Sequence, residues 1–415
     1  MADNKDKKVL NVPALRFPEF TREWKEHYLA EYLDFKNGLN PSANKFGSGI
    51  KFISVMDILN NDFITYDCIR TSVEITPEEQ VAFVVEKGDM LFQRSSETLE
   101  DVGRANVYMD NRPAVFGGFV IRGKKKAEYN PMFFRYLLAS PYARKKIIPM
   151  GAGAQHFNIG QDGLSKVKLH FPILQEQQKI AALLRLIDER IATQNKIIEK
   201  LETLIKGITD VLLDNPLWEK VFLHSFMQFY QSNSLSWEQL SYEDGKIRNL
   251  HYGLIHNFST KGINANSLPM ILSHNEPKQY TLCKVGDVAF ADASEDTNEI
   301  GKAVEFISVH PSGTICGLHT LHGRDIKNKT VVGFKGFAFN SRYFHDQIKR
   351  LAQGSKVFSI TANNLLSCYI YIPNIAKQEM ITKLLHAYEE KIMANKTLLD
   401  KYEMQRTYLL QRMFI

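Results

Sequence analysis

Residues 172–213 read PILQEQQKIAALLRLIDERIATQNKIIEKLETLIKGITDVLL, and residues 373–413 read PNIAKQEMITKLLHAYEEKIMANKTLLDKYEMQRTYLLQRM. A constant offset of 201 residues aligns the two stretches without a gap and matches, among others, Pro172 with Pro373 and Gln177 with Gln378. Apolar residues recur every three or four positions in both, which is typical of amphipathic helices with a heptad seam. The sequence therefore predicts two long helices of related origin.

A seam of this length must be covered, so we expect the helices to pair as an antiparallel coiled coil. The seam positions are Ile180, Leu184, Ile187, Ile191, Gln194, Ile198 and Leu201 in the first helix, and Ile381, Leu385, Tyr388, Ile392, Asn395, Leu399 and Tyr402 in the second. Gln194 lies near the middle of its seam, and Asn395 is its repeat equivalent. One interpretation is a central amide layer that fixes the register; the other is that both amides face solvent or a partner.

The duplication extends upstream of the helices. Gly88-Asp89 matches Gly286-Asp287, and Ser96-Glu97 matches Ser294-Glu295, at a slightly smaller offset. The order of the chain is therefore globule, helix, globule, helix, and we predict an α+β fold. The predicted segments are an N-terminal arm (1–20), a first globule (21–171), a first helix (172–215), a second globule (216–372) and a second helix (373–415).

Within the globules, short apolar runs broken by turns predict strands, and two stretches predict helices. The expected strands lie near 51–55, 81–85, 115–121, 285–290 and 314–321, and the expected helices at 132–146 and 341–351. The first 19 residues are polar at their start and suggest a poorly anchored arm.

The composition is that of an ordinary globular protein. The 415 residues include 44% apolar and 24% charged residues, enough for two cores of normal size. We expect a cytoplasmic protein that does not enter the membrane, because no apolar run approaches the length of a membrane span or a signal-peptide core. The four cysteines lack metal-ligand spacing, which favours reduced, buried thiols and no metal site. A net charge of +6 permits nucleic-acid binding without requiring it.

Catalytic motifs are weak or incomplete. Asn130-Pro131-Met132-Phe133 lacks the second proline of an adenine methyltransferase motif and is more typical of a helix start. Gly301-Lys302-Ala303 lacks the upstream glycine and the hydroxyl residue of a phosphate loop. His319 and His322 suggest a strand or turn more than a metal site, since the sequence offers no third ligand. The acidic run 292–296 is more typical of a solvated loop than of a nuclease.

Four motifs together resemble the specificity subunits of type I restriction-modification systems. They are LRFPEF (15–20) followed by Trp24, KGDMLF (87–92) leading into Arg94-Ser95-Ser96, GAGAQHFNI (151–159), and FPILQEQQKI (171–180) at the start of the first helix. The resemblance covers essentially the whole chain. It is weaker in the second half, where Ala376-Lys377-Gln378-Glu379 replaces the Gln-Glu-Gln run.

This resemblance implies a non-catalytic subunit with two target-recognition domains, each reading one half of a bipartite asymmetric sequence in double-stranded DNA. The paired helices would separate the domains and dock two modification (methyltransferase) subunits. Those subunits would carry S-adenosylmethionine and methylate adenine, and restriction subunits that use ATP and Mg could join them. No catalytic residue, metal or cofactor is expected in this chain.

Candidate DNA contacts combine cations for the phosphates with polar residues in repeat-equivalent loops for the bases. They are Arg94, Ser95, Ser96, Thr98, Arg104, Arg122, Lys124, Lys125, Lys126, Arg144, Lys145, Gln155, His156, Asn158, Asp292, Ser294, Asp296, Lys302, Arg342, Lys349, Lys356 and Ser359. For each basic cluster the alternative is a solvated helix or hairpin face. For the whole chain the alternative is a coiled-coil protein-interaction scaffold without specific DNA binding, which the modest net charge favours.

Overall fold

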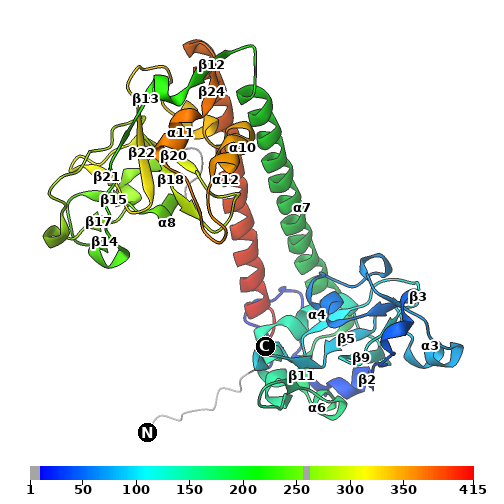
Figure 1. Ribbon diagram of the computed structural model, residues 1–415. Coiled ribbons are helices and arrows are strands. Elements are labelled where there is room, and N and C mark those ends of the chain that lie inside the picture. Colours follow the sequence, from blue (N-terminus) through cyan, green and yellow to red (C-terminus); the bar gives the residue numbers. More distant parts are fainter. Residues whose placement is uncertain (1–9, 256–261) are drawn as a thin grey trace, which may run out of the picture. The chain divides into compact units, whose positions relative to one another are not determined.

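The computed structural model describes residues 10–255 and 262–415 and divides the chain into two compact units (Figure 1). Unit 1 comprises Met1–Asn195 and Leu398–Ile415, and unit 2 comprises Lys196–Thr397. The two long helices are α7 (Leu174–Leu213) and α12 (Ile375–Arg412). Each contributes one part to unit 1 and the other part to unit 2. The predicted α+β class with two long helices is confirmed.

Unit 1 is built on a four-stranded antiparallel sheet in the order β2-β9-β5-β7. It also contains a three-stranded sheet in the order β4-β3-β8. Its strands are β1 (Lys25–Tyr28), β2 (Leu33–Asn37), β3 (Phe46–Ile53), β4 (Ser72–Val73), β5 (Met90–Gln93), β6 (Ser95–Ser96), β7 (Ala105–Val107), β8 (Val115–Phe116), β9 (Val120–Lys125), β10 (Phe157–Asn158) and β11 (Lys168–Phe171). Its shorter helices are α1 (Leu29–Tyr32), α2 (Val55–Leu59), α3 (Pro77–Phe83), α4 (Pro131–Ala139), α5 (Pro141–Ile147) and α6 (Gln161–Ser165).

Unit 2 repeats this plan around the sheet β13-β22-β18-β20-β16, beside a second sheet β14-β17-β15-β21. Its strands are β12 (Glu219–Phe222), β13 (Met227–Tyr230), β14 (Leu240–Ser241), β15 (Arg248–Leu250), β16 (Ile263–Asn264), β17 (Met270–Ile271), β18 (Val288–Ala291), β19 (Ala293–Ser294), β20 (Ala303–Ser308), β21 (Thr314–Cys316), β22 (Thr320–Asp325), β23 (Phe358–Ser359) and β24 (Tyr369–Ile372). Its shorter helices are α8 (Tyr252–Ile255), α9 (Phe334–Ala338), α10 (Arg342–Leu351) and α11 (Ala362–Ser367).

The repeat-equivalent glutamines brace the start of each long helix in the same way. Gln177 donates to Pro172 O at 3.0 Å and accepts from Asn130 N at 3.0 Å. Gln378 donates to Pro373 O at 2.9 Å and accepts from Val331 N at 2.9 Å. Both glutamines are buried, so the bonds satisfy backbone groups that water does not reach. The repeat found in the sequence is therefore also a repeat of local structure.

The last residues of the chain complete the core of unit 1. Leu409, Leu410, Met413 and Phe414 of the C-terminal segment pack with the residues of the first globule and with the start of α7. Within this unit Asp188 of α7 accepts from Arg406 of α12 at 2.6 Å. Arg190 lies over the ring of Tyr402. Residue numbers on the two helices run in opposite directions, so the helix segments of unit 1 are antiparallel.

The end of α7 completes the core of unit 2, as the C-terminal segment completes the core of unit 1. Leu213 joins the buried core of the second globule, and Ile205 and Ile208 pack against it. Ile381 and Leu385, from the start of α12, lie in the same core. Further along, Glu202 of α7 contacts Lys396 of α12 at 2.7 Å, again with antiparallel register.

Most seam residues are removed from solvent. Ile180, Leu184, Ile187, Gln194, Ile198, Ile381, Leu385 and Ile392 are buried, and Ile191, Leu201, Tyr388, Asn395, Leu399 and Tyr402 are partly buried. Gln194 belongs to unit 1 and Asn395 to unit 2, so the central amide layer stays a prediction.

Three local predictions for unit 1 are wrong. The stretch 81–85 is not a strand, because Thr76 caps α3 and Pro77 occupies its first turn. The single helix expected at 132–146 is two helices, since Ser140 ends α4 and Pro141 starts α5. The N-terminal arm is anchored where the structure describes it: Arg16 makes two bonds of 2.7 Å to the buried carboxylate of Glu176.

The helix expected at 341–351 is confirmed as α10. Among the described residues, no helix has the length and apolar character that a membrane span requires.

Candidate nucleic-acid interface

The structure joins two of the loops chosen from the sequence in unit 1. Strand β6 pairs antiparallel with β10, which places Ser95 opposite Asn158 and Ser96 opposite Phe157. The Ser95 hydroxyl donates to the Asn158 side-chain oxygen. Gly153 turns the chain before β10 with φ 142°, and an added Cβ would lie 2.0 Å from His156 O. Only glycine fits this tight turn, whose tip exposes Gln155 and His156.

Unit 2 forms the same arrangement from different residues. Strand β19 pairs antiparallel with β23, which places Ala293 opposite Ser359 and Ser294 opposite Phe358. Gly354 has φ 131°, and an added Cβ would lie 1.9 Å from Val357 O. The turn that follows exposes Lys356. We call residues 94–98, β10 and the turn at 153–156 the first hairpin edge, and residues 292–296, β23 and the turn at 354–357 the second hairpin edge.

The backbone hydrogen bonds of the two edges correspond one to one. In unit 1 they run from Arg94 N to Phe119 O at 2.9 Å and from Ile159 N to Arg94 O at 2.9 Å; in unit 2 they run from Asp292 N to His319 O at 3.2 Å and from Ile360 N to Asp292 O at 2.9 Å. Each edge also has a serine hydroxyl that accepts from the amide two residues ahead, Ser96 from Thr98 and Ser294 from Asp296.

The side chains on this shared backbone differ. The repeat-equivalent pairs are Arg94 and Asp292, Thr98 and Asp296, Phe119 and His319, Gln155 and Lys356, His156 and Val357, and Asn158 and Ser359. The first edge therefore presents a guanidinium and amides, whereas the second presents carboxylates, an ammonium and an imidazole. Polar groups of these kinds can form hydrogen bonds with base edges, and different groups suit different bases.

Phe119 and His319 were missed as candidates, although both lie beside the edges. Phe119 is 68% exposed, and His319 has a positive φ of 55° and contacts the Asp292 carboxylate at 3.1 Å. The sequence could have indicated both residues. Each lies two positions after a repeat-equivalent glycine, Gly117 or Gly317, in the turn between two strands that match in the repeat.

The basic candidates of strand β9 lie away from the first edge. Val120 pairs with Gln93 beside that edge, while Lys125 pairs with Leu33 at the other end of the strand. Lys124 contacts Glu86 at 3.2 Å, and Lys125 donates to Tyr129 O at 3.2 Å. Lys126 is the exposed member of the cluster.

Arg122 and Arg144 do not fit the prediction of phosphate contacts. Arg122 is 5% exposed, because its side chain lies under the sheet over the Phe116 ring and donates to Val84 O. Arg144 donates to Glu100 O and Val102 O at 2.8 and 2.6 Å, which ties α5 to the neighbouring loop. Burial, reinforced by the nearby Arg104 charge, lowers the pKa of Arg144 to about 10, so the guanidinium stays charged near neutral pH.

His345 in unit 2 supports this structural role for Arg144. It is the repeat equivalent of Arg144, and its Nε2 lies 3.1 Å from Ile300 O, the equivalent of Val102 O. Both side chains therefore bond the same backbone carbonyl position. Burial lowers the pKa of His345.

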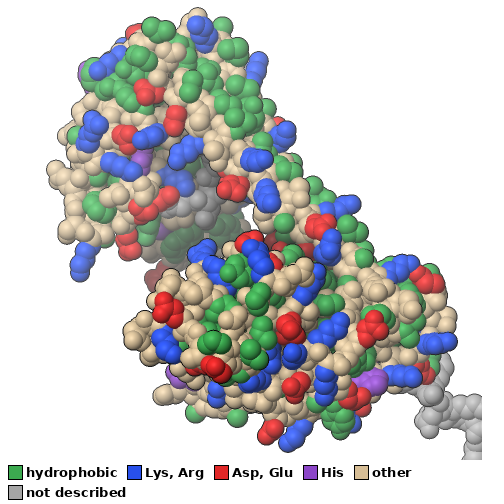
Figure 2. Space-filling model, turned by 90° about the vertical axis from the view of Figure 1, so that its right-hand side faces the viewer, with side chains coloured by type: hydrophobic (Ala, Val, Ile, Leu, Met, Phe, Trp, Pro, Cys, Tyr) green, Lys and Arg blue, Asp and Glu red, His purple; other side chains and the backbone are tan. Residues whose placement is uncertain are grey.

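The remaining cations of unit 1 are at the surface. Arg104 pairs with Asp101 at 2.6 Å and is half-exposed, and Lys145 is exposed on α5. Figure 2 shows Lys and Arg side chains interspersed with Asp and Glu on the visible face of each unit. Because exposed ion pairs are weak and exchange readily, such cations remain available to phosphates.

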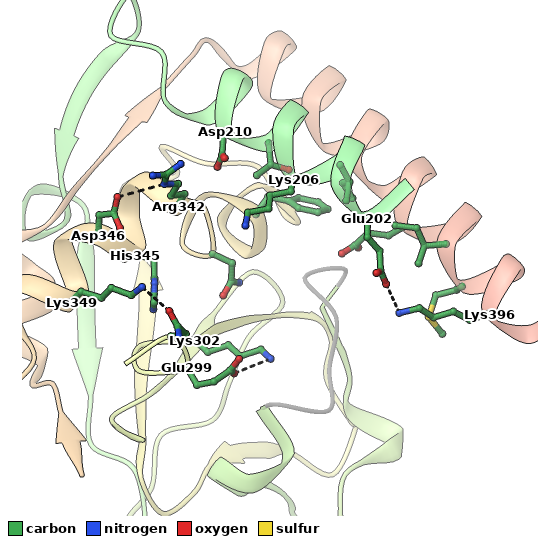
Figure 3. Close-up of a pocket in the computed structure, with 18 residues that line it drawn as sticks. Glu202, Lys206, Asp210, Glu299, Lys302, Arg342, His345, Asp346, Lys349 and Lys396 are labelled. Carbon is green, nitrogen blue, oxygen red and sulfur yellow. Dashed lines mark hydrogen bonds and ion pairs between the residues drawn. The ribbon is translucent and has the colours of Figure 1, made fainter. Parts of the chain in front are cut away.

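In unit 2, three candidate cations line one cavity of about 730 Å³ between α10, the loop after β19 and the two long helices. Lys302 contacts Glu299 at 3.4 Å, Lys349 donates to Asn298 at 2.8 Å, and Arg342 lies 4.0 Å from Asp346 (Figure 3). The sequence did not indicate that these residues meet. The loop 295–302 links this cavity to the second hairpin edge.

Comparison with known proteins agrees with this architecture. Residues 21–203 match the model of the type I restriction modification DNA specificity domain. A putative type I restriction enzyme MjaX specificity subunit of Methanocaldococcus jannaschii is 24% identical over 396 residues, which cover 92% of this chain and 90% of the relative. The MjaVIII specificity subunit of the same organism is 24% identical over 201 residues, or 47% of this chain and 46% of the relative.

Two solved structures share the fold. The S subunit of a type I restriction-modification system from M. genitalium has a TM-score of 0.56 at 15% identity and covers 97% of this chain and 99% of its own. A chain from a structure of the assembly and conformational transition of the type I R-M system has a TM-score of 0.57 at 14% identity, with 93% and 96% covered. The chain is therefore similar in sequence to type I restriction-modification specificity subunits, most clearly over residues 21–203, and it shares the fold of the two solved structures.

Proposed function

We propose that this chain is the non-catalytic recognition subunit of a type I restriction-modification enzyme and that each unit reads one half of a bipartite, asymmetric DNA site. The observation that carries the proposal is the pair of hairpin edges, which share their backbone hydrogen bonds but differ in their exposed polar side chains. Two units with the same backbone but different exposed side chains suit a DNA target with two different half-sites.

The chemistry of each edge suggests different base preferences. Arginine forms bidentate bonds with guanine, glutamine and asparagine bond adenine, and carboxylates accept from the cytosine amino group. Arg94, Gln155 and Asn158 supply the first two kinds of group in unit 1. Asp292 and Lys356 supply a carboxylate acceptor and a donor in unit 2. Exposed lysines such as Lys126 and Lys145 would add phosphate contacts that fix orientation.

The long helices would dock two modification subunits, which carry S-adenosylmethionine and methylate adenine; restriction subunits with ATP and Mg complete the proposed assembly. Both long helices keep large apolar side chains on the surface, among them Met404 and Tyr408 one turn apart in unit 1 and Met393 in unit 2. Exposed apolar clusters of this kind are typical of protein interfaces, where methionine and tyrosine are enriched.

The test of DNA reading uses one variant in each edge. Gln155→Ala and Lys356→Ala, each expressed with the modification subunits, should relax the methylated sequence in different halves of the site, because each removes a base-contacting group from one unit. About 1–3 kcal/mol of discrimination is expected for a good bidentate contact. Lys327→Ala removes another exposed lysine of unit 2 that lies outside the edge and should leave the methylated sequence unchanged.

Methylome sequencing is the measurement. Relaxation of the same half by both variants would contradict the proposal. A second measurement titrates the purified chain with DNA at two salt concentrations, with and without the modification subunits. Absence of binding in every case would support the alternative, a protein-interaction scaffold without specific DNA binding.

Docking is tested separately. The double variant Met404→Asp/Tyr408→Ala should lose co-purification of a modification subunit, because a charge enters an apolar contact and an aromatic anchor is removed. Gln405→Ala, on the same helix, should retain it. Unchanged assembly in the double variant would exclude this face of α12 as a docking surface.

A further inference from the structure

Two cysteines and one histidine of unit 2, far apart in the sequence, meet in the core. Cys283, Cys316 and His322 are 4%, 2% and 0% exposed. Both sulfur atoms and one ring nitrogen of His322 lie within 4.8 Å of one another, and the two sulfurs are 3.6 Å apart. Among the described residues, these three side chains are the group placed closely enough to hold a metal ion.

The three residues are tied to the strands of unit 2. Cys283 donates its amide to Thr314 O at 2.8 Å, Cys316 ends β21, and His322 lies on β22 opposite Ala289 of β18. Cys283 lies in the irregular segment before β18, where this backbone bond to Thr314 ties it to the start of β21. The ligand atoms are therefore preorganised, which lowers the entropy lost when an ion binds.

The orientation of His322 leaves one nitrogen available. Its Nε2 lies 2.7 Å from the Asp287 carboxylate, which is itself fixed by Arg324 at 2.7 and 2.8 Å. Its Nδ1 is buried and has no hydrogen-bond partner among the described residues. A carboxylate on the outer nitrogen is the usual partner of a metal-bound histidine, since it fixes the tautomer and strengthens the ligand. Without a ligand, a buried nitrogen that has no hydrogen-bond partner destabilises the fold.

The spacing and chemistry fit zinc. With Zn–S bonds of about 2.3 Å, two thiolates of a tetrahedral site lie about 3.8 Å apart, close to the 3.6 Å found here. A disulfide would require about 2.05 Å. Two thiolates and a neutral imidazole balance the charge of Zn²⁺, and such soft ligands discriminate against Mg²⁺ and Ca²⁺.

We propose that Cys283 Sγ, Cys316 Sγ and His322 Nδ1 bind a zinc ion in unit 2, with Asp287 as the supporting carboxylate and a water as the fourth ligand. The ion joins β21, β22 and the segment before β18. Strand β18 continues directly into Asp292 and Ser294 of the second hairpin edge, so the zinc stiffens the base of that edge.

Unit 1 has no corresponding set of ligands at the repeat-equivalent positions. The repeat equivalents of Cys283, Cys316 and His322 are Val85, Phe116 and Arg122. Val85 repeats the backbone contact of Cys283, since its amide donates to Ala114 O at 2.7 Å. Val85 and Phe116 fill the space with apolar atoms, and Arg122 reaches past them to Val84 O. The zinc site is therefore specific to unit 2.

The test measures metal in the full-length chain. Protein purified under reducing conditions and supplied with Zn²⁺ should retain zinc at close to an equimolar ratio after desalting, as measured by mass spectrometry of the elements. Cys283→Ser and Cys316→Ser should lose it. Cys368→Ser, which alters a buried cysteine outside the cluster, should keep it. Asp287→Asn should bind zinc about 10- to 100-fold more weakly.

A second measurement needs no variant. Wild-type protein loaded with Co²⁺ should show the intense thiolate-to-cobalt absorption and the visible bands of a tetrahedral site. Absence of these bands together with absence of retained zinc would overturn the proposal, as would a Cys283–Cys316 disulfide in the reduced preparation. Zinc retained by the Cys283→Ser and Cys316→Ser variants would place the ion elsewhere and would equally overturn the proposal.

Discussion

Phe414→Ala, a change next to the C-terminus, is expected to destabilise the N-terminal globule by about 3–5 kcal/mol, the usual cost of removing a buried aromatic side chain. Phe414 is 3% exposed and packs against Trp24 and Phe133, with ring centroids 6.4 and 5.7 Å away. Its removal leaves a cavity between rings that cannot easily collapse, because Trp24 is also fixed by its bond to Glu176.

Hydrogen exchange followed by mass spectrometry measures this effect unit by unit. Peptides from β5, β9 and α4 should exchange faster in the variant, and peptides from β18 and β22 should not. Tyr408→Ala removes an aromatic ring of similar size that is 52% exposed, and it should change neither set. Faster exchange confined to unit 2 would show that the C-terminal residues do not complete the core of unit 1.

Asp188→Ala is the second change with a large expected effect. The Asp188 carboxylate accepts from Tyr136 Oη at 2.7 Å and from Arg406 Nε at 2.6 Å, and Arg135 lies 3.9 Å away. Burial lowers the pKa of Arg135, and the nearby Asp188 carboxylate opposes that shift. Without Asp188, Arg406 loses this partner and Arg135 keeps only Asp62, 3.7 Å away. The groups are partly buried, so the expected loss lies between the cost of an exposed pair and the roughly 3–5 kcal/mol of a fully buried one.

Chemical denaturation with a probe in unit 1 measures the loss. The neighbouring Glu189 provides the control, because it forms an exposed pair with Arg185 at 3.0 Å. Glu189→Ala should cost at most about 1 kcal/mol, as exposed pairs do. Equal effects of the two substitutions would mean that the Asp188 network does not hold the two helix segments together.

The sequence predicted the features that depend on periodicity and repetition. The 201-residue offset located both long helices, and the structure confirms them as α7 and α12. Gln177 and Gln378 matched in the alignment and make the same bonds. The sequence chose the loops around Ser95 and Asn158 separately, and only the structure shows that they meet, through the pairing of β6 with β10.

Features that depend on distant contacts were missed. Arg122 sits in a basic stretch, but strand alternation turns its side chain under the sheet, where Phe116 covers it. Cys283 and Cys316 have no ligand spacing along the chain, since tertiary contacts and not sequence proximity bring them to His322. Arg16 appeared to belong to a loose arm because its partner, Glu176, lies in a helix that starts about 160 residues later.

The central claim is that the two units read DNA independently, and methylome sequencing of two reciprocal chimaeras tests it most directly. One chimaera carries residues 21–171, and the other residues 216–372, of a second specificity subunit, each produced with the modification subunits. The account predicts that each chimaera methylates a bipartite sequence in which one half has changed, a different half in each case, while the other half stays as in the parent. A chimaera in which both halves change, or in which the parental sequence persists intact, would contradict it.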